Sequence, residues 1–450
     1  MRTIGKMLVF LLGAILIGTL LLVIVYMLPT DGMRENVKAA MKSLSKEGVR
    51  NSWAAFSYTR PPADLSTEKN IKVSDVGRSA KPYTISDGYT DAIMLSKAIY
   101  AAKSPVSNAM MNPSYSVPGK TSAPNDPVAR LGEILSHDVD GNNAEKMSVS
   151  NYPRYWHGYL VCMKPLLMFA GVSGIRIINL VLQLLMFTLI AVKISEEVGA
   201  AYSLAFAASV LVIDPISAAV CFQYSHVYYV ILATMAVMLC LNGRLQENGG
   251  YCVLFMFSGI LTAYMDLLTY PFASLGMPMV LYLILKDNVK LGKKILDMIA
   301  LGLSWLLGYA GMWAGKWLMS WLITGYNAFG DAMGAVSNRV LGEIHGITLQ
   351  EMLLRLSSTK IFWLAIIILF LVITAVFVLV SLSVRKGRAS TAEVLPLCLV
   401  SLYPFVWYSV VMNHSVIHYF FTHKLLAVSV FSLSCVLIKC SGYKGSRCHE

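Results

Sequence analysis

The sequence Ser86-Asp87-Gly88-Tyr89-Thr90-Asp91-Ala92-Ile93-Met94-Leu95 lies inside a long polar interruption, residues 28–157, of an otherwise apolar chain. One strongly apolar segment precedes this interruption, and an almost continuous apolar tract follows it. Of the 450 residues, 56% are hydrophobic and only 14% are charged. Runs of about 20 apolar residues span a bilayer, where backbone polar groups must be paired within a helix. The sequence therefore predicts an all-α polytopic membrane protein.

The charge and cysteine patterns narrow the possible partners. The net charge is +12, which in a soluble chain would suggest a nucleic-acid partner. Here Lys and Arg gather at the ends of apolar segments, as positive-inside topology requires, so no nucleic-acid partner is expected. The eight cysteines all lie outside residues 28–157. A translocated stretch without cysteine needs no disulfides and is compatible with a bacterial protein.

About ten membrane-spanning helices are expected, with both termini in the cytoplasm of a multi-pass cell-membrane protein. The expected spans are Met7–Leu28, Ile175–Ala191, Ala200–Val220, Tyr224–Leu241, Tyr251–Tyr270, Phe272–Leu285, Ile295–Met312, Ile361–Val384, Val394–Val411 and Leu425–Ile438. Basic residues occupy the proposed inner ends, and the short turn between the third and fourth spans has no Lys or Arg, which sets this orientation.

Three regions follow from this topology. Residues 1–28 are an uncleaved signal anchor, because the apolar run is longer than the roughly 7–15 residues of a signal-peptide core. Residues 29–157 form an extracytoplasmic loop domain. Residues 158–450 form the polytopic membrane domain, and an amphipathic second outer segment occupies residues 313–360 within it.

The loop domain is expected to contain short helices at the membrane surface. Helical spacing runs from Met33 to Arg50, and a helix is expected over Asp91–Lys103 with Thr90 as its N-cap. Residues 104–150 are rich in Pro, Asn, Ser and Gly, which indicates irregular loop. Residues 156–170 are apolar but interrupted by Lys164-Pro165, which suits a short interfacial helix.

Asp87 and Asp91 are the first candidates for chemistry. If Asp91 opens a helix and Asp87 just precedes it, both carboxylates can face one cavity at the membrane surface. Such a pair can bind a divalent cation, with Mg or Mn as the possible ion, or accept a proton beside a phosphate leaving group. The alternative is that both acids serve the start of the helix and its dipole.

Arg154 and His157 lie in the aromatic stretch Tyr152-Pro153-Arg154-Tyr155-Trp156-His157. Tyr and Trp at an interface usually anchor a protein in the membrane. Arginine binds phosphate oxygens bidentately. Both residues are expected at headgroup depth, so they are candidates for binding a lipid phosphate.

Two further groups lie near the outer ends of apolar spans. Asp266 is a candidate cavity residue because an acid at membrane depth is costly, although it could instead cap the following helix. His414, His418 and Lys424 lie in the short turn before the last span. His414 and His418 are four residues apart, so a helix would place them on one face. Metal ligation, a proton relay and phosphate binding each suit them, and so does a plain interfacial role.

Two stretches resemble the GT-C superfamily of integral-membrane glycosyltransferases. Residues 87–95, DGYTDAIML, are similar to the acidic motif that leads into the first surface helix of that family. Residues 155–176, YWHGYLVCMKPLLMFAGVSGIR, resemble the second surface helix and its entry into the next span. The likeness covers roughly the first 200 residues and the general topology.

The resemblance implies a GT-C-like fold and transfer of a sugar from a polyprenyl-phosphate donor to an envelope glycan, lipid or protein on the outer face. Asp87 or Asp91 would act as base or metal ligand. Arg154, His418 and Lys424 would contact the donor phosphate. The competing hypothesis is a non-catalytic membrane protein, either a flippase or transporter or a scaffold for envelope glycan assembly.

Overall fold

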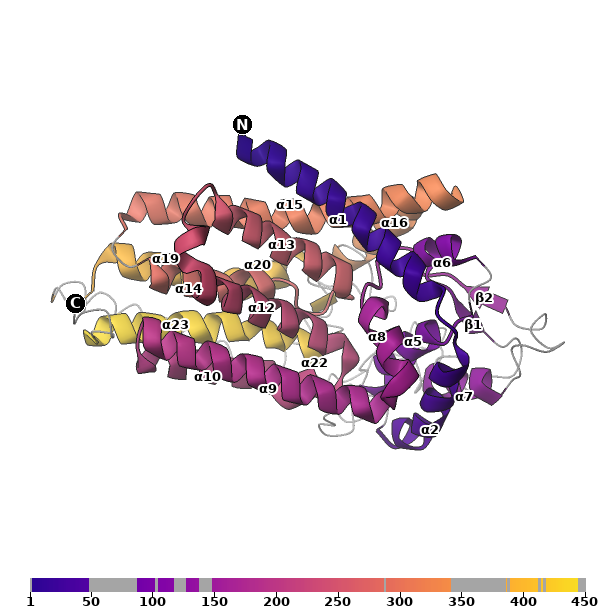
Figure 1. The fold of residues 1–450 in the computed structure, drawn as a ribbon. Helices are drawn as coiled ribbons and strands as arrows, with labels where there is room; N and C mark the ends of the chain where they lie inside the picture. Colours follow the sequence, from indigo (N-terminus) through magenta and orange to yellow (C-terminus); the bar gives the residue numbers. More distant parts are fainter. Residues whose placement is uncertain are drawn as a thin grey trace, which may run out of the picture.

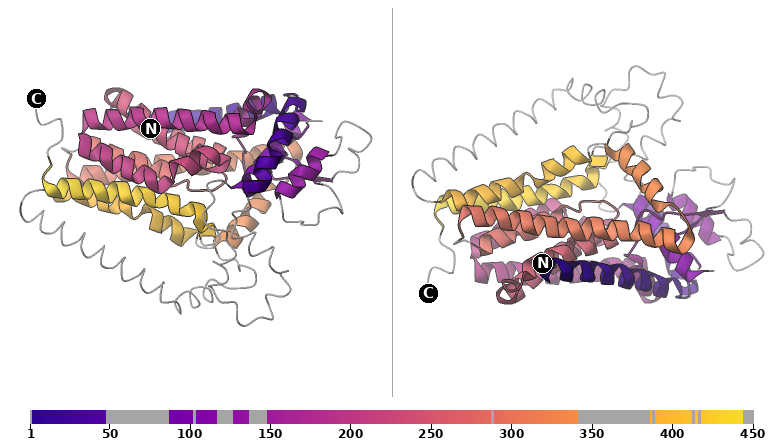
Figure 2. Two further views of the ribbon diagram at one scale, coloured as in Figure 1. Left: turned by 90° about the horizontal axis from the view of Figure 1, so that it is seen from below. Right: turned by 90° about the horizontal axis from the view of Figure 1, so that it is seen from above.

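The structure of the chain is a computed structural model, and nearly all of its regular structure is helical (Figure 1). The residues that it describes are 2–47, 87–101, 104–116, 127–136, 148–286, 289–340, 386, 389–411, 414–415 and 418–443. Long helices lie side by side in one bundle, and a group of shorter helices covers the end of the bundle far from the C-terminus. Figure 2 shows the same arrangement from two further sides.

The shorter elements at the covered end come mostly from the polar interruption. They are α2 (Asp31–Glu47), α5 (Gly88–Ala98), α6 (Pro105–Met111), β1 (Ser114–Ser116), α7 (Pro127–Ser136), β2 (Ser148–Ser150) and α8 (Leu160–Phe169). The two strands pair antiparallel, with Tyr115 opposite Val149.

The bundle is built from the apolar segments. Its elements are α1 (Arg2–Tyr26), α9 (Gly171–Glu197), α10 (Ala200–Ile213), α11 (Pro215–Val220), α12 (Phe222–Leu245), α13 (Gly250–Met265), α14 (Ala273–Leu285), α15 (Leu291–Thr324), α16 (Ala328–Val340), α19 (Thr391–Ser401), α20 (Tyr403–Val410), α22 (Tyr419–Thr422), a 3-10 turn (His423–Leu426) and α23 (Ala427–Ser441).

Six helical segments of the described chain are long and apolar enough to cross a membrane. They are Gly5–Tyr26, Gly171–Glu197, Phe222–Leu245, Leu291–Thr324, Thr391–Val410 and His423–Ser441. The prediction of an all-α membrane protein is thus confirmed, but of the nine expected spans that fall within the described residues only these six reach that length. Three others form the shorter helices α10, α13 and α14. The expected span over residues 361–384 lies outside the described residues.

Several predicted boundaries need correction. The third expected span is broken at Asp214, which adopts a left-handed conformation between α10 and α11. The seventh does not end at Met312, since α15 continues to Thr324. Residues 104–150 are not wholly irregular, because they contain α6, α7 and the two strands.

The hydrophobic core continues from the bundle into the shorter helices. One cluster of buried side chains lies within the bundle. A second joins α1, α2, α5, α6, α7 and α8 to Tyr264 of α13 and Met312 of α15. Gly158 allows the chain before α8 to approach the end of α13 closely, because a Cβ at this position would lie 2.6 Å from the carbonyl oxygen of Tyr264.

Three buried lysines bond to carbonyl groups at the C-terminal ends of the short helices. Lys316 of α15 donates to the carbonyls of Ala109 and Met110 in α6, at 3.0 and 2.8 Å. Lys164 of α8 donates to Ala98, the last residue of α5, at 2.7 Å. Lys97 donates at 2.7 Å to the carbonyl of Asn112, the C-cap of α6. Cations favour helix C-termini, so these contacts fix the short helices to one another and to the bundle.

Candidate functional site

Asp87 and Asp91 lie at the start of α5, and both are buried. Asp87, not Thr90, is the N-cap of this helix. Its carboxylate accepts hydrogen bonds from the N–H of Tyr89 at 3.2 Å and from the hydroxyl of Thr90 at 3.1 Å. A short polar side chain at the N-cap satisfies donors that the first helical turn leaves free, which explains why the helix begins here.

The beginning of α12 holds both acids in place. The Phe222 N–H donates to Asp91 at 2.9 Å, and the Gln223 side-chain amide donates to the carboxylate of Asp87. The backbone N–H of Asp87 in turn donates to the sulfur of Cys221 at 3.1 Å. Three consecutive residues of the bundle therefore position the two acids of α5.

Arg176 of α9 completes the arrangement. Its guanidinium donates to the carboxylate of Asp91 at 3.0 Å, and the Arg176 side chain is 13% exposed. The same guanidinium lies 5.7 Å from the centre of the Phe222 ring. The acid pair is thus enclosed by α5, α9 and α12. Its partners are distant in sequence: Arg176 is 85 residues from Asp91, and Gln223 is 136 residues from Asp87.

The electrostatic environment raises the pKa of both acids. Burial raises the pKa of Asp91 to about 7, against the opposing attraction of Arg176 and with a smaller contribution from the negative charge of Asp87. Burial also raises the pKa of Asp87, while hydrogen bonds from Thr90, Gln223 and Tyr89 lower it. A carboxyl group with a pKa near 7 can exchange a proton at neutral pH.

Binding of Mg or Mn at the acid pair stays a prediction. Within the described residues, no group of three or more His, Cys, Asp or Glu side chains could hold a metal ion. One oxygen of Asp91 accepts from the guanidinium of Arg176, and a cation in that place does not suit a divalent metal. A divalent cation at Asp91 would therefore compete with Arg176 for this oxygen.

Arg154 and His157 lie in a separate aromatic cluster. The guanidinium of Arg154 is 3.4 Å from the carboxylate of Asp331 and lies 4.9 Å from the centre of the Tyr152 ring, with the Arg154 side chain 26% exposed. His157 is buried, and its ring nitrogens contact the hydroxyl of Tyr159 at 3.1 Å and the carbonyl of Tyr152 at 3.3 Å. Arg154 is accessible to a ligand, whereas His157 packs inside.

The environment of His157 is strongly cationic. Burial lowers its pKa well below the usual value, and the positive charges of Lys97, Lys316 and Arg154 lower it further. Burial likewise lowers the pKa of Lys97 to about 7. The low pKa of His157 favours its neutral ring, which offers no positive charge to attract a phosphate.

The residues of the last turn bond to the backbone of the bundle. The ring of His414 lies 2.7 Å from the carbonyl of Leu268, and its centre is 4.6 Å from that of His418. The ammonium of Lys424 is buried and donates to the carbonyl of Ile213 at 2.6 Å and to the hydroxyl of Ser217 at 3.1 Å. These contacts support a structural role for His414 and Lys424.

Asp266 follows α13 as its C-cap. Its buried carboxylate accepts from the N–H of Thr269 at 2.9 Å and from the hydroxyl of the same residue at 2.5 Å. Asp266 therefore closes the turn after α13 and does not cap α14, whose N-cap position is occupied by Phe272.

The predicted site residues thus divide into three groups. Asp87 and Asp91 lie together and meet Arg176 and residues 221–223. Arg154 and His157 lie in the aromatic cluster with Lys97. His414, with His418 beside it, bonds to the turn before α14 that also holds Asp266, and Lys424 bonds to the turn before α11. No pattern in the sequence indicates the roles of Cys221, Phe222 and Gln223. Arg176 ends the stretch that resembles the GT-C family, but the sequence assigns it no function.

Comparison of the chain with protein-family models, with curated proteins and with solved structures finds no match. The acid pair and its surroundings are therefore interpreted from their own geometry.

Proposed function

We propose that this chain is a bacterial membrane glycosyltransferase of GT-C type. It moves a sugar from a polyprenyl-phosphate donor to an envelope glycan, lipid or protein on the outer face of the cell membrane. The observation that carries the proposal is the buried pair of Asp87 and Asp91, in which the pKa of Asp91 is about 7. In the proposed topology both termini are cytoplasmic, and the covered end of the bundle is extracytoplasmic.

In the proposed reaction Asp91 is the base. Its carboxylate takes the proton of the acceptor hydroxyl, and the acceptor oxygen forms a bond to the anomeric carbon of the sugar. The bond from that carbon to the phosphate oxygen breaks, and the phosphate leaves with the electron pair. Asp87 and Arg176 position Asp91, and no step uses a metal.

Arg154 is the best candidate for the leaving phosphate among the proposed cationic residues. Its guanidinium is partly exposed and is held by Asp331 rather than by a backbone carbonyl. A cation that stabilises developing negative charge lowers the barrier to transfer. Lys424, His157 and His414 are buried and already bonded within the protein.

A scaffold is the second candidate, and one observation favours it. The carboxylates of Asp87 and Asp91 bond to α9 and α12 as well as to α5. In a scaffold the acid pair would be only one of several contacts that hold the short helices on the bundle, beside those of the buried lysines, so its loss would be tolerated. Substitution of the acids distinguishes the two functions.

The test is complementation of a deletion strain of the native host with Asp91→Asn and Asp87→Asn, at matched levels of membrane protein. We expect Asp91→Asn to remove at least 99% of a specific envelope sugar, because losing a positioned general base costs roughly 10²–10⁴ in rate. We expect a smaller loss for Asp87→Asn. The readout is the sugar composition of the envelope.

Asp297→Asn is the matched control, because Asp297 pairs with Lys293 near the start of α15, away from the acid pair. It should leave the sugar composition unchanged. A normal composition in both acid variants, against a clear change in the deletion strain, would favour the scaffold.

A further inference from the structure

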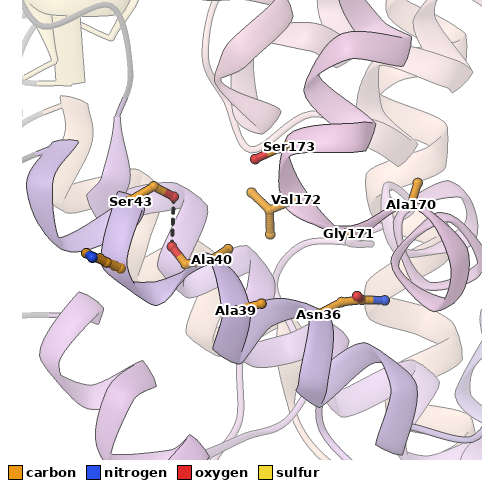
Figure 3. A pocket seen from close by; sticks show the side chains of 9 residues that line it. Asn36, Ala39, Ala40, Ser43, Ala170, Gly171, Val172 and Ser173 are labelled. Atoms are coloured by element: carbon orange, nitrogen blue, oxygen red, sulfur yellow. Dashed lines mark hydrogen bonds between the residues drawn. The ribbon is translucent and has the colours of Figure 1, made fainter.

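An open pocket lies between α2 and the junction of α8 with α9, apart from the acid pair. Its volume is about 480 Å³, which is within the usual range for small-molecule sites. Lys42 and Ser43 of α2 form one wall, and Val172 and Ser173 of α9 form the opposite wall. Figure 3 shows the α2 side chains facing the first turn of α9.

The pocket is held open by a fixed contact between its two walls. The side-chain amide of Asn36 donates to the carbonyl of Leu167 in α8 at 2.8 Å. Gly171 makes the turn between α8 and α9 with a φ of +63°, a conformation that glycine adopts without strain. The separation of α2 from the junction is thus set by the Asn36 side chain together with the backbone turn at Gly171.

An exposed apolar strip runs along α9 from the pocket. Ser173 lines the pocket, and Ile177, Val181 and Leu184 follow it at helical spacing on the same face. These three side chains are 62%, 50% and 59% exposed. Since α9 is one of the helices long and apolar enough to cross a membrane, this strip faces the acyl chains of the bilayer.

The polar wall carries positive charge at the end of that strip. Lys42 of α2 lines the pocket and is exposed. A lysine beside an apolar surface complements a ligand with an anionic head and an apolar tail. A free anion would interact with the lysine but would make no contact with the apolar strip of α9.

We propose that this pocket binds the headgroup of an anionic phospholipid. The ammonium of Lys42 contacts the phosphate, the hydroxyl of Ser173 donates to it, and the acyl chains lie along Ile177, Val181 and Leu184. The site is independent of the glycosyltransferase proposal, since it uses neither acid. Such a lipid joins α2 to the membrane-facing side of α9.

The test uses the purified full chain in nanodiscs that contain phosphatidylcholine with added phosphatidylglycerol. Native mass spectrometry after mild release counts the lipids retained. We expect the wild type to retain phosphatidylglycerol in preference to phosphatidylcholine. Lys42→Gln should weaken this retention about fivefold, because one basic residue contributes about that factor to binding of an anionic lipid.

Two further variants make the result specific. Lys38→Gln removes the same charge from the same helix but does not line the pocket, so it should leave retention unchanged. Ala39→Trp fills the pocket from an exposed position of α2 and should abolish retention of phosphatidylglycerol. Thermal unfolding within a few degrees of the wild type confirms that each variant is folded.

Three outcomes would overturn the proposal. Equal losses in Lys42→Gln and Lys38→Gln would show that only general surface charge attracts the lipid. Unchanged retention in Ala39→Trp would place the lipid elsewhere. Complete displacement of the lipid by millimolar inorganic phosphate would show a site for a free anion, in which the strip on α9 has no part.

Discussion

At the scale of the residue, the protonation of Asp91 is set by two opposing influences. Burial favours the neutral carboxyl group, and the guanidinium of Arg176 at 3.0 Å favours the carboxylate. The result is a pKa of about 7. In its proposed role as base, Asp91 should become more active as the pH rises through about 7.

Replacing Arg176 with Gln should move the pH profile of transfer to higher pH. The substitution removes the positive charge that lowers the pKa of Asp91, and burial continues to raise it. Because the base must be deprotonated, the acid limb of kcat/KM shifts upward from about pH 7. The measurement is the initial rate of sugar transfer between pH 5 and 9 in reconstituted membranes, with the range chosen about that pKa.

Arg34→Gln is the control for this prediction. Arg34 donates to the carbonyl of Ile134 at 3.2 Å, and it has no part in the acid pair. Its replacement should leave the midpoint of the acid limb in place. A midpoint that is the same in Arg176→Gln and the wild type would contradict the role given to Asp91.

The sequence identifies the acids of this site but not their partners. Asp87 and Asp91 are recognisable because acidic residues at a predicted helix start suggest either a cap or a reactive pair. Arg176 is 85 residues from Asp91, and Gln223 is 136 residues from Asp87. Phe222 contributes its backbone N–H, which every residue except proline carries, so no side-chain pattern could reveal it.

At the scale of the element, α13 and α15 pack with their backbones in close approach. A Cβ at Gly259 would lie 2.1 Å from the carbonyl oxygen of Trp305, and one at Gly308 would lie 2.1 Å from that of Met256. Small residues allow helices to approach in this way in membranes. The two glycines therefore fix the distance between these helices.

Gly259→Ala should destabilise the protein by about 1–3 kcal/mol, because the added methyl group meets backbone atoms that cannot move without separating the helices. The measurement is thermal or denaturant unfolding of the purified chain in detergent. Gly302→Ala on α15 is the matched control, since a Cβ there meets nothing within 4 Å. The control should be neutral or slightly stabilising. Equal effects of the two variants would refute the close approach.

Apolar periodicity predicts where helices occur but not how far each extends. The pattern from Ala200 to Val220 suggests one span, whereas Asp214-Pro215 divides it into α10 and α11. Proline at the first helical position is a recognisable start signal, so this break could have been found. The extension of α15 beyond Met312 could not, because Lys316 is accommodated by carbonyl groups of α6, about 200 residues away in sequence.

At the scale of the whole molecule, buried lysines hold the short helices on the bundle. Lys316→Met should remove the hydrogen bonds to Ala109 and Met110 while keeping an unbranched side chain in the same space. We expect a loss of about 1–3 kcal/mol, because buried carbonyl groups would be left without their donor. Amide hydrogen exchange should become at least tenfold faster in α6 than in the wild type, with little change in α12.

Lys293→Met is the control for this variant, because Lys293 is an exposed lysine near the start of the same helix. Its replacement should change the stability by less than about 0.5 kcal/mol. Faster exchange spread evenly over the bundle in Lys316→Met would show general destabilisation and would refute a local docking contact.

The contact between Lys316 and α6 also orders the events of biosynthesis. A chain is made from its N-terminus, so α6 leaves the ribosome some 200 residues before its cationic partner exists. The same delay applies to Asp87, whose partner Gln223 follows 136 residues later. The short helices can therefore complete these contacts only after residue 316 of the 450 has been made.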